Sequence, residues 1–598
     1  MTRSSCATTN NDTNDENEDY YDVKPFGMLF FLFDSPAEKR KYLHSRRESL
    51  GEFFSSFLDD RVLMNVLEHM DDAKTLAKFT MASKMCFQYA SFDSLWKKLY
   101  LNRFGLEEAD FRRCRNWKQL YYVKANETTL TMKKKMGCVY SDALYLPKQI
   151  NNLEIKKTWV ESFTVPEIDC SSSEKRTLAD EESIESRFRE EFENKNRPVV
   201  LRGLAKEWRA IEKWKTNDAL LNEYGDETFL VGGYRTSLNN YLSYCLREND
   251  TDDSKLLLFD PKVAKEEMWT ENTEIFEEGG LFHNLFSKDG DYFKVLGEEK
   301  RPHYKWVIFG PNRSGSTFHV DPNGTSAWNA VLRGRKKWIL FPNDEVPPGV
   351  FPSEDNASVV CPLTPLEWYE NFYDTLLSCG DDDFEGEETS KRAHHFQETI
   401  CEAGDVIFVP SQWWHCVVNL PPEHDDQDQD EEDRNVHLAL TANFVSRSNM
   451  PTVLKILDSK NSNLVSGYDD KTQRRSLGEA FEKRMREMYP EILEDARKQR
   501  ARTTKKEIAP PRKQQKRVGR LAKTTENANN VTKKPRGENA NKNNTKNKIS
   551  TATTIFSQHQ QEQYTSSFAF SFWAKEEETN DTTTQANTNN TNKFLSLS

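Results

Sequence analysis

The sequence predicts a multidomain protein, with a small all-α domain and then an all-β double-stranded jelly roll with flanking helices, between disordered N- and C-terminal tails. Three observations lead to this fold class. Apolar residues recur with helical spacing over about residues 52–103. Short apolar runs bounded by Gly, Pro, Asn and Asp fill residues 183–455, as in antiparallel double-sheet folds. Both ends are polar, and 598 residues leave room for several folded units.

The N-terminal segment, residues 1–50, is expected to be mostly disordered. It begins acidic and Asn-rich, without the basic and apolar regions of a signal peptide. Its strongest apolar run, "FGMLFFLF" at Phe26–Phe33, has eight residues, whereas a membrane-spanning helix needs about 20. We therefore expect no membrane partner and interpret this run as a docking segment or a short strand.

The predicted helical domain, residues 52–103, contains three short amphipathic segments. In the first, Val62, Val66 and Met70 fall on one stripe of a helix. The last ends in "SLWKKL", Ser94–Leu99. Three short helices that close in this way resemble the F-box, with one departure, because Leu58-Asp59 replaces the usual Leu-Pro start.

The F-box resemblance implies a partner. It predicts docking of residues 52–103 onto the Skp-type adaptor of a cullin-RING ubiquitin ligase. The alternative is a helical subdomain that only packs against the rest of the chain.

Residues 104–182 show no clear periodicity and are expected to be a linker. The predicted strands then follow in quick succession, from "RPVVLRGL" at Arg197–Leu204 to "VHLALTANFV" at Val436–Val445. A helical pattern precedes them in "SIESRFREEFEN", and C-terminal helices are expected over 456–496.

Residues 497–598 are expected to be a disordered tail, first basic and then rich in Asn, Thr and Gln. The basic cluster Arg512, Lys513, Lys516 and Arg517 has the form of a nuclear-import signal, so we expect a nuclear location, alone or shared with the cytoplasm. A formal net charge of -13 argues against a whole surface that binds nucleic acid, which leaves the basic tail as its expected binding region.

Cysteine spacing bears on both the compartment and the metal. The chain has ten cysteines and no C-x-x-C pair. This pattern predicts a reducing compartment and argues against a zinc site made of thiolates.

The candidate metal site begins in "TFHVD". Side chains two residues apart on a strand share a face, so His319 and Asp321 are expected to point the same way. A third ligand can come from "GDVIFVPSQWWHCVVNL", where His415 opens a strand. Two imidazoles and one carboxylate form the facial triad that suits non-haem Fe(II) and leaves positions open for other ligands.

A lysine in the predicted strand "KKWILFP" strengthens this interpretation. Lys336 shares strand parity with Trp338 and Leu340 and is therefore expected to project into an apolar interior. A buried ammonium needs an anionic partner, which a dicarboxylate co-substrate can provide. Lys337 has the opposite parity and is expected to be dispensable.

The segments "GPNRSGSTFHVDPNGTSAWNAVLRGRKKWILFP", "GDVIFVPSQWWHCVVNL" and "LALTANF" resemble JmjC-domain Fe(II)/2-oxoglutarate oxygenases, specifically the phosphatidylserine-receptor-like branch of lysyl hydroxylases and arginine demethylases. The resemblance covers residues 183–455. It implies an enzyme that uses Fe(II) with 2-oxoglutarate and O2 as co-substrates. It cannot decide between hydroxylation and demethylation, or between lysine and arginine.

The same resemblance assigns roles to individual residues. It implies that His319, Asp321 and His415 are the catalytic iron ligands, and that Lys336 and Thr441 bind the distal carboxylate of 2-oxoglutarate. Asn329 and Ser316 complete the pocket. In one departure from the family branch, Leu257 stands where a tyrosine is usual, so one contact to the co-substrate is expected to be missing.

Two acidic runs, Asp381–Glu388 and Glu423–Asp433, interrupt the predicted jelly roll and suggest a basic protein or peptide as substrate. The alternative is that they are solvated insertions. Two rival functions remain open. One is a ubiquitin-ligase receptor whose jelly roll only binds, and the other is a cupin that acts on a small molecule or tRNA.

Overall fold

The computed structural model describes residues 22–24 and most of 60–508, with longer gaps at 126–137, 262–279, 379–395 and 423–429. Several predictions lie outside these residues. They concern nearly all of the N-terminal segment, the acidic run Asp381–Glu388, most of the run Glu423–Asp433, and the tail beyond Ile508.

The first described unit is helical, with α2 (Asp60–Glu68), α3 (Ala73–Thr80), α4 (Lys84–Ala90), α5 (Asp93–Phe104) and α6 (Trp117–Ala125). Polar caps define where these helices start. Asp72 accepts hydrogen bonds from the backbone N–H groups of Lys74 and Thr75, and Ser83 caps α4 through Cys86 N–H. On α5, Trp96 is fully buried and donates from Nε1 to the carbonyl of Ala90 at 2.7 Å, which fixes α5 against α4.

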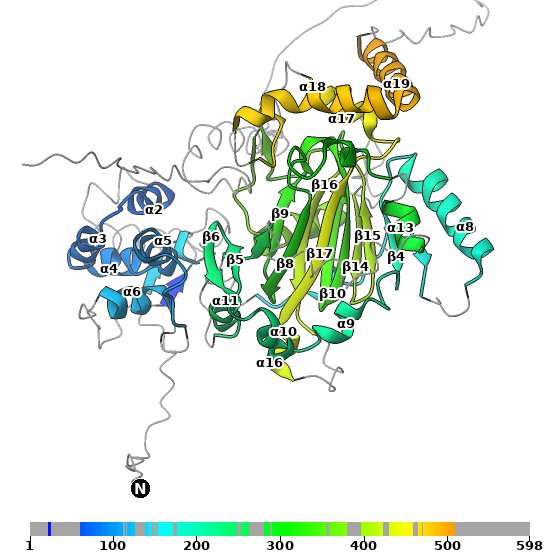
Figure 1. Cartoon of the computed structure of the whole chain (residues 1–598). Coiled ribbons are helices and arrows are strands. Elements are labelled where there is room, and N and C mark those ends of the chain that lie inside the picture. The colour runs from blue at the N-terminus through cyan, green and yellow to red at the C-terminus, as the bar shows by residue number, and fades with distance from the viewer. Residues whose placement is uncertain are drawn as a thin grey trace, which may run out of the picture.

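Two sheets form the centre of the molecule (Figure 1). The larger has nine strands, in the order β3 (Glu167–Asp169), β4 (Val199–Arg202), β15 (Val406–Val409), β10 (Ser326–Arg333), β17 (Val436–Phe444), β8 (Lys305–Pro311), β7 (Leu258–Asp260), β5 (Thr228–Val231) and β6 (Tyr234–Ser237). The smaller has four, in the order β14 (Gln397–Cys401), β11 (Arg335–Phe341), β16 (Trp414–Leu420) and β9 (Gly315–His319). Neighbouring strands are antiparallel except β3 and β4. The strand pattern of the sequence therefore correctly predicted a β-rich two-sheet domain.

Short elements complete the fold. Two further sheets pair β1 (Asp22–Lys24) with β2 (Cys138–Tyr140) and β12 (Phe351–Pro352) with β13 (Val359–Val360). The helices around the sheets are α8 (Leu178–Arg187), η3 (Phe188–Glu193), α9 (Arg209–Lys213), α10 (Asn217–Tyr224), α11 (Leu238–Cys245), α13 (Leu281–Phe286), η4 (Tyr292–Leu296), η5 (Pro322–Gly324), α14 (Pro365–Trp368), η6 (Tyr369–Tyr373), α15 (Asp374–Ser378) and α16 (Glu431–Arg434), with η1 (Lys157–Trp159) ahead of them.

The range 104–182 differs from the expectation of a linker. It contains α6, whose Trp117 is buried against Phe111 with ring centroids 4.8 Å apart. It also contains β3, which pairs with β4, and Trp159, which is buried 5.1 Å from the ring of Tyr369. Single aromatic anchors hold this range in place, and such anchors leave no periodic signal in a sequence.

The helical unit joins the larger sheet through a buried charge cluster around Asp252. Lys97 of α5 forms an ion pair with Asp252 at 2.9 Å, and Trp117 of α6 donates to the same carboxylate at 3.2 Å. From the sheet side, Tyr244 of α11 donates to it at 2.9 Å. Figure 1 shows α2–α6 beside β5, β6 and α11. The two units therefore share one buried junction.

Among the described residues, the last strand is followed by α17 (Met450–Ile456), α18 (Lys471–Met488) and α19 (Pro490–Ile508), which lie across one end of the strands (Figure 1). The tail was expected to start at 497, but α19 continues beyond it. Ion pairs explain how so polar a helix is held, because Arg497 pairs with Glu482 and Arg500 pairs with Asp458 at 2.7 Å. None of the helices described has the length and apolar character needed to cross a bilayer.

Candidate metal and co-substrate site

Three predicted ligands meet between the two sheets. His319 ends β9 and His415 lies on β16, directly opposite it in the strand register, with ring centroids 4.1 Å apart. Asp321 follows β9 by two residues. One nitrogen or oxygen atom from each residue lies within 4.8 Å of the others, so the three can bind a single ion.

Backbone contacts orient both imidazole rings. Nδ1 of His319 lies 2.8 Å from the carbonyl oxygen of Thr317, and Nδ1 of His415 lies 3.1 Å from that of Trp413. A carbonyl can only accept, so each Nδ1 carries the proton and Nε2 is the nitrogen that can bind a metal. Burial lowers the pKa of each ring to about 4, which keeps both imidazoles neutral at neutral pH, as metal binding requires.

The surroundings of Asp321 show whether the three side chains suit a metal ion. Burial raises the pKa of its carboxyl to about 6, against the opposing effects of His319 and a hydrogen bond from Asn443. Oδ2 of Asp321 is buried and accepts no hydrogen bond from the described residues. A buried carboxylate oxygen without a partner is costly, and a cation would satisfy it. Two neutral imidazoles with this carboxylate fit Fe(II).

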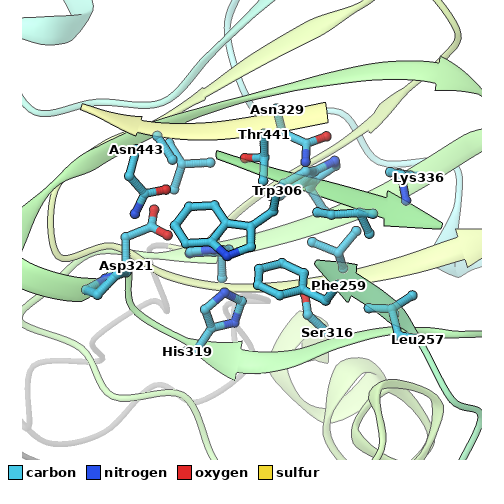
Figure 2. A pocket seen from close by; sticks show the side chains of 18 residues that line it. Leu257, Phe259, Trp306, Ser316, His319, Asp321, Asn329, Lys336, Thr441 and Asn443 are labelled. Carbon is cyan, nitrogen blue, oxygen red and sulfur yellow. The ribbon is translucent and has the colours of Figure 1, made fainter. Parts of the chain in front are cut away.

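All seven predicted site residues line one pocket, which extends from the three ligands between the sheets. Figure 2 shows Asp321 and Asn443 at one end of the pocket, Lys336 at the other, and Trp306 between them. Ser316 lies on β9, and Asn329 and Thr441 lie opposite each other on β10 and β17.

Two of these polar groups differ in their bonding. Oδ1 of Asn329 is buried and has no hydrogen-bond partner among the described residues. Thr441 donates its hydroxyl to the carbonyl of Trp328 at 2.7 Å. Asn329 therefore has an unused acceptor at the pocket, while the hydroxyl of Thr441 must turn before it can donate to a ligand.

Lys336 has the surroundings of an anion-binding group. Its side chain is buried, and Nζ donates to Oδ1 of Asn419 at 2.7 Å. Among the described residues no carboxylate lies within ion-pair distance of this nitrogen. Burial lowers the pKa of Lys336 to about 7. A charged ligand at this end of the pocket would supply the missing counter-charge.

Lys337 points to the opposite face from Lys336, as its parity predicted, but it has a structural partner there, so the expectation that it is dispensable is limited to anion binding. Its side chain is 1% exposed and forms an ion pair at 2.8 Å with Glu398, which is also 1% exposed. Lys337 also donates to the carbonyl of Ser162 at 3.0 Å, and Tyr373 donates to Glu398 at 2.9 Å. The opposite parity was correct, but α14, η6 and residues 150–160 cover this outer face of the small sheet with a second core.

Sequence reasoning missed three aromatic or polar residues that line the pocket, namely Trp306, Phe259 and Asn443, and a fourth residue, Asn419, that contacts Lys336 from outside the lining. Trp306 of β8 stacks on Phe259 of β7, with ring centroids 5.5 Å apart and planes 22° apart, and both line the pocket. Asn443 bonds to Asp321, and Asn419 holds Lys336. Strand parity could have identified Asn443, which is two residues from Thr441, and Phe259, which is two residues from Leu257. Leu257 itself lines the pocket and adds no polar contact there.

Comparisons with known proteins agree with this geometry. Residues 185–450 match the family model described as a cupin-like domain. The chain is 34% identical over 486 residues to the arginine-specific demethylase JMJ22 of Arabidopsis thaliana, covering 80% of this chain and 83% of that protein.

Two further relatives are more distant. The bifunctional arginine demethylase and lysyl-hydroxylase psr-1 of Caenorhabditis elegans is 29% identical over 349 residues, which are 56% of this chain and 73% of psr-1. The 2-oxoglutarate and iron-dependent oxygenase JMJD4 of Gallus gallus is 29% identical over 137 residues, which are 23% of this chain and 28% of JMJD4. The chain belongs to the JmjC family of cupin-like 2-oxoglutarate- and iron-dependent oxygenases.

Proposed function

We propose that this oxygenase uses Fe(II), 2-oxoglutarate and O2 to hydroxylate side chains of a basic protein or peptide. One observation carries the proposal, namely that a single pocket holds a His-Asp-His triad at one end and a buried, carboxylate-free lysine at the other. A metal alone would not explain the lysine. A dicarboxylate that also reaches the metal explains both ends of the pocket.

The residues present match this chemistry. Iron and 2-oxoglutarate, when bound, supply the oxidising power, since decarboxylation to succinate is coupled to insertion of oxygen into a C–H bond. Lys336 would bind the far carboxylate, and Thr441, Asn329 and Ser316, which line the same pocket, would surround the co-substrate. The stacked rings of Trp306 and Phe259 form an apolar wall that excludes water from the reacting centre.

The names of the relatives suggest the reaction outcome. JMJ22 is named an arginine-specific demethylase, and psr-1 combines arginine demethylation with lysyl hydroxylation. Hydroxylation of an N-methyl group releases formaldehyde, whereas hydroxylation of a carbon chain leaves an alcohol. We propose that the substrate is lysine or methylarginine in a basic tail, such as that of a histone or an RNA-associated protein. The acidic run Glu423–Asp433, between β16 and β17, supports a basic partner.

The test is succinate release from 2-oxoglutarate in the presence of arginine- and lysine-rich peptides, with and without N-methylation. We expect turnover by the wild type and none by His319→Ala. Mass spectrometry of the peptide then separates a gain of one oxygen from a loss of one methylene. Equal succinate release by both proteins would contradict the enzyme assignment and favour a jelly roll that only binds.

We also propose that the helical unit is an F-box that docks onto a Skp-type adaptor of a cullin-RING ligase. The support is two exposed apolar side chains within the predicted range, Val66 at 47% and Met81 at 73% exposure. The double variant Val66→Asp/Met81→Asp should abolish adaptor binding in a pull-down. Val123→Asp is the matched control, because Val123 is 63% exposed but lies on α6, outside residues 52–103. Adaptor binding lost equally in both variants, or in neither, would count against the F-box.

We further propose a nuclear location, which the basic cluster at Arg512–Arg517 supports. Alanine at the four basic positions of this cluster should shift a fluorescently tagged chain into the cytoplasm. Unchanged nuclear accumulation would show that another segment carries the signal.

A further inference from the structure

The C-terminal helices are connected to the metal site by a short stretch of chain. Residues Leu464–Tyr468, here called the bridging segment, join α17 to α18. In the sequence they lie more than a hundred residues beyond the metal ligand Asp321. In the structure they contact the turn η5, which immediately follows Asp321.

Asn323 makes the contact with both ends of its amide. Its Nδ2 donates to the carbonyl of Ser466 at 3.1 Å, and its Oδ1 accepts from the backbone N–H of Ser466 at 3.0 Å. Asn323 is 4% exposed and has a φ of 59°, a left-handed conformation that asparagine tolerates better than most residues. Two hydrogen bonds made by one buried side chain fix both the position and the rotation of this turn.

The bridging segment is itself anchored on the other side. Val465 is buried in the core of the C-terminal helices, with Leu454, Leu477 and Phe481. Gly467 accepts a hydrogen bond from His303 N–H at 2.8 Å, and Tyr468 donates to the carbonyl of Lys300 at 2.7 Å. The segment therefore holds the chain that leads into β8, which carries Trp306, as well as the turn after Asp321.

A Cβ at Gly467 would lie 3.1 Å from Cβ of Pro302, so the segment and the loop before β8 are in close contact. Both connections run to elements that line the pocket. The carboxylate of Asp321 has a buried oxygen that no described residue satisfies, so it would turn toward water if the turn relaxed. Holding η5 in place keeps the carboxylate where the two imidazoles need it.

On the basis of the proposed function, we propose that Asn323 is a positioning residue for the metal site and that it acts by tying the Asp321 turn to the C-terminal helices through the bridging segment. The C-terminal helices are then part of what sets metal affinity, although none of the three ligands lies on them.

The test measures metal affinity in the full-length chain, with Mn(II) as a redox-silent probe and electron paramagnetic resonance to count the free ion. Asn323→Gly keeps the left-handed backbone and removes both hydrogen bonds. We expect about 10- to 100-fold weaker Mn(II) binding, the usual effect of losing a residue that orients a ligand. Ser466→Ala is the matched control, because Ser466 contacts Asn323 only through its backbone, and it should bind Mn(II) as the wild type does.

A second variant covers the case in which Asn323→Gly does not fold. Val465→Ala loosens the anchor inside the C-terminal core, far from the ligands in the sequence, and should weaken Mn(II) binding several-fold. Wild-type Mn(II) affinity in folded Asn323→Gly, or in folded Val465→Ala where Asn323→Gly does not fold, would overturn the inference, even if the melting temperature falls. Absence of Mn(II) binding by the wild type would instead contradict the proposed function, and this inference with it.

Discussion

Lys336 and Lys337 are consecutive residues of β11, and both are buried, but their ammonium groups have opposite surroundings. On the outer face of the small sheet, Lys337 pairs with the carboxylate of Glu398 at 2.8 Å. On the inner face, Lys336 contacts the neutral amide of Asn419 at 2.7 Å. One charge is neutralised within the fold, and the other is left for a ligand. Burial alone therefore does not identify a functional lysine, whereas the partner of its ammonium group does.

The largest effect is expected from removing the outer lysine. Lys337→Ala leaves Glu398 buried without its counter-ion, and breaking one side of a buried pair typically costs about 3–5 kcal/mol. Chemical denaturation should show the loss. The double variant Lys337→Met/Glu398→Leu, which removes both charges, should recover most of it. If Lys337→Ala is as stable as the wild type, the ion pair does not stabilise the fold, and the structural role assigned to Lys337 is wrong.

The inner lysine should behave in the reverse manner. Lys336→Met removes a charge that the fold does not neutralise, so the free energy of unfolding should stay the same or rise. Binding of 2-oxoglutarate, measured by calorimetry with Mn(II) present, should weaken by about 1.5–3 kcal/mol, the range for a hydrogen bond to a charged group. Strong destabilisation together with unchanged 2-oxoglutarate binding would reverse the roles assigned to the two lysines.

A carboxylate placed beside Lys336 should make the inner face resemble the outer one. Asn419→Asp puts an anion where the amide oxygen now lies and gives the lysine an internal counter-ion. We expect 2-oxoglutarate to bind about tenfold more weakly, roughly 1.4 kcal/mol. Thermal stability should fall modestly, because Nδ2 of Asn419 donates to Oγ of Ser314 at 2.9 Å and a carboxylate oxygen cannot donate. Unchanged affinity would mean that the neutrality of Asn419 is irrelevant to the site.

The effect that is smallest at neutral pH is a pH dependence of co-substrate binding. Burial lowers the pKa of Lys336 to about 7, and a bound dianion favours the ammonium and so raises that pKa. Binding therefore takes up a proton as pH rises above about 7, and affinity should fall by up to about tenfold per pH unit. Lys336→Arg stays charged and should flatten the slope. If the affinity for 2-oxoglutarate changes with pH equally in the wild type and in Lys336→Arg, titration of Lys336 is not the cause.

The sequence predicted the inner face of the small sheet, which lines the pocket, better than its outer face. Period-2 alternation identified the side of β11 on which Lys336 lies, and the same rule placed His319 and Asp321 together. Alternation states which way a side chain points but not what covers it. Glu398 belongs to β14, and the helices over Lys337 lie elsewhere in the chain, so only the tertiary fold shows that Lys337 is buried.

Long-range contacts mark the limit of sequence reasoning elsewhere too. Asn323 and Ser466 lie in irregular chain with no periodicity, and the two hydrogen bonds between them arise only after the C-terminal helices pack. Single buried tryptophans hold much of the range 104–182 in the same way, as at Trp117 and Trp159. In contrast, the strands from β8 to β11 carry regular apolar alternation and close turns, and their order along the chain was predictable.

The junction at Asp252 has a consequence for any protein bound to the helical unit. Although burial by itself raises the pKa of Asp252, Lys97 and Arg247 keep it below its usual value, so the carboxylate stays charged inside the joint. An interface that contains buried, paired charges holds the two units in one relative orientation, which a flexible linker does not do. An adaptor that bound α2–α4 would be held at one orientation to the oxygenase. A target protein carried by that adaptor would then reach the pocket at an effective concentration that the fixed geometry sets. This concentration would be high for targets whose side chains can reach the pocket and near zero for the others.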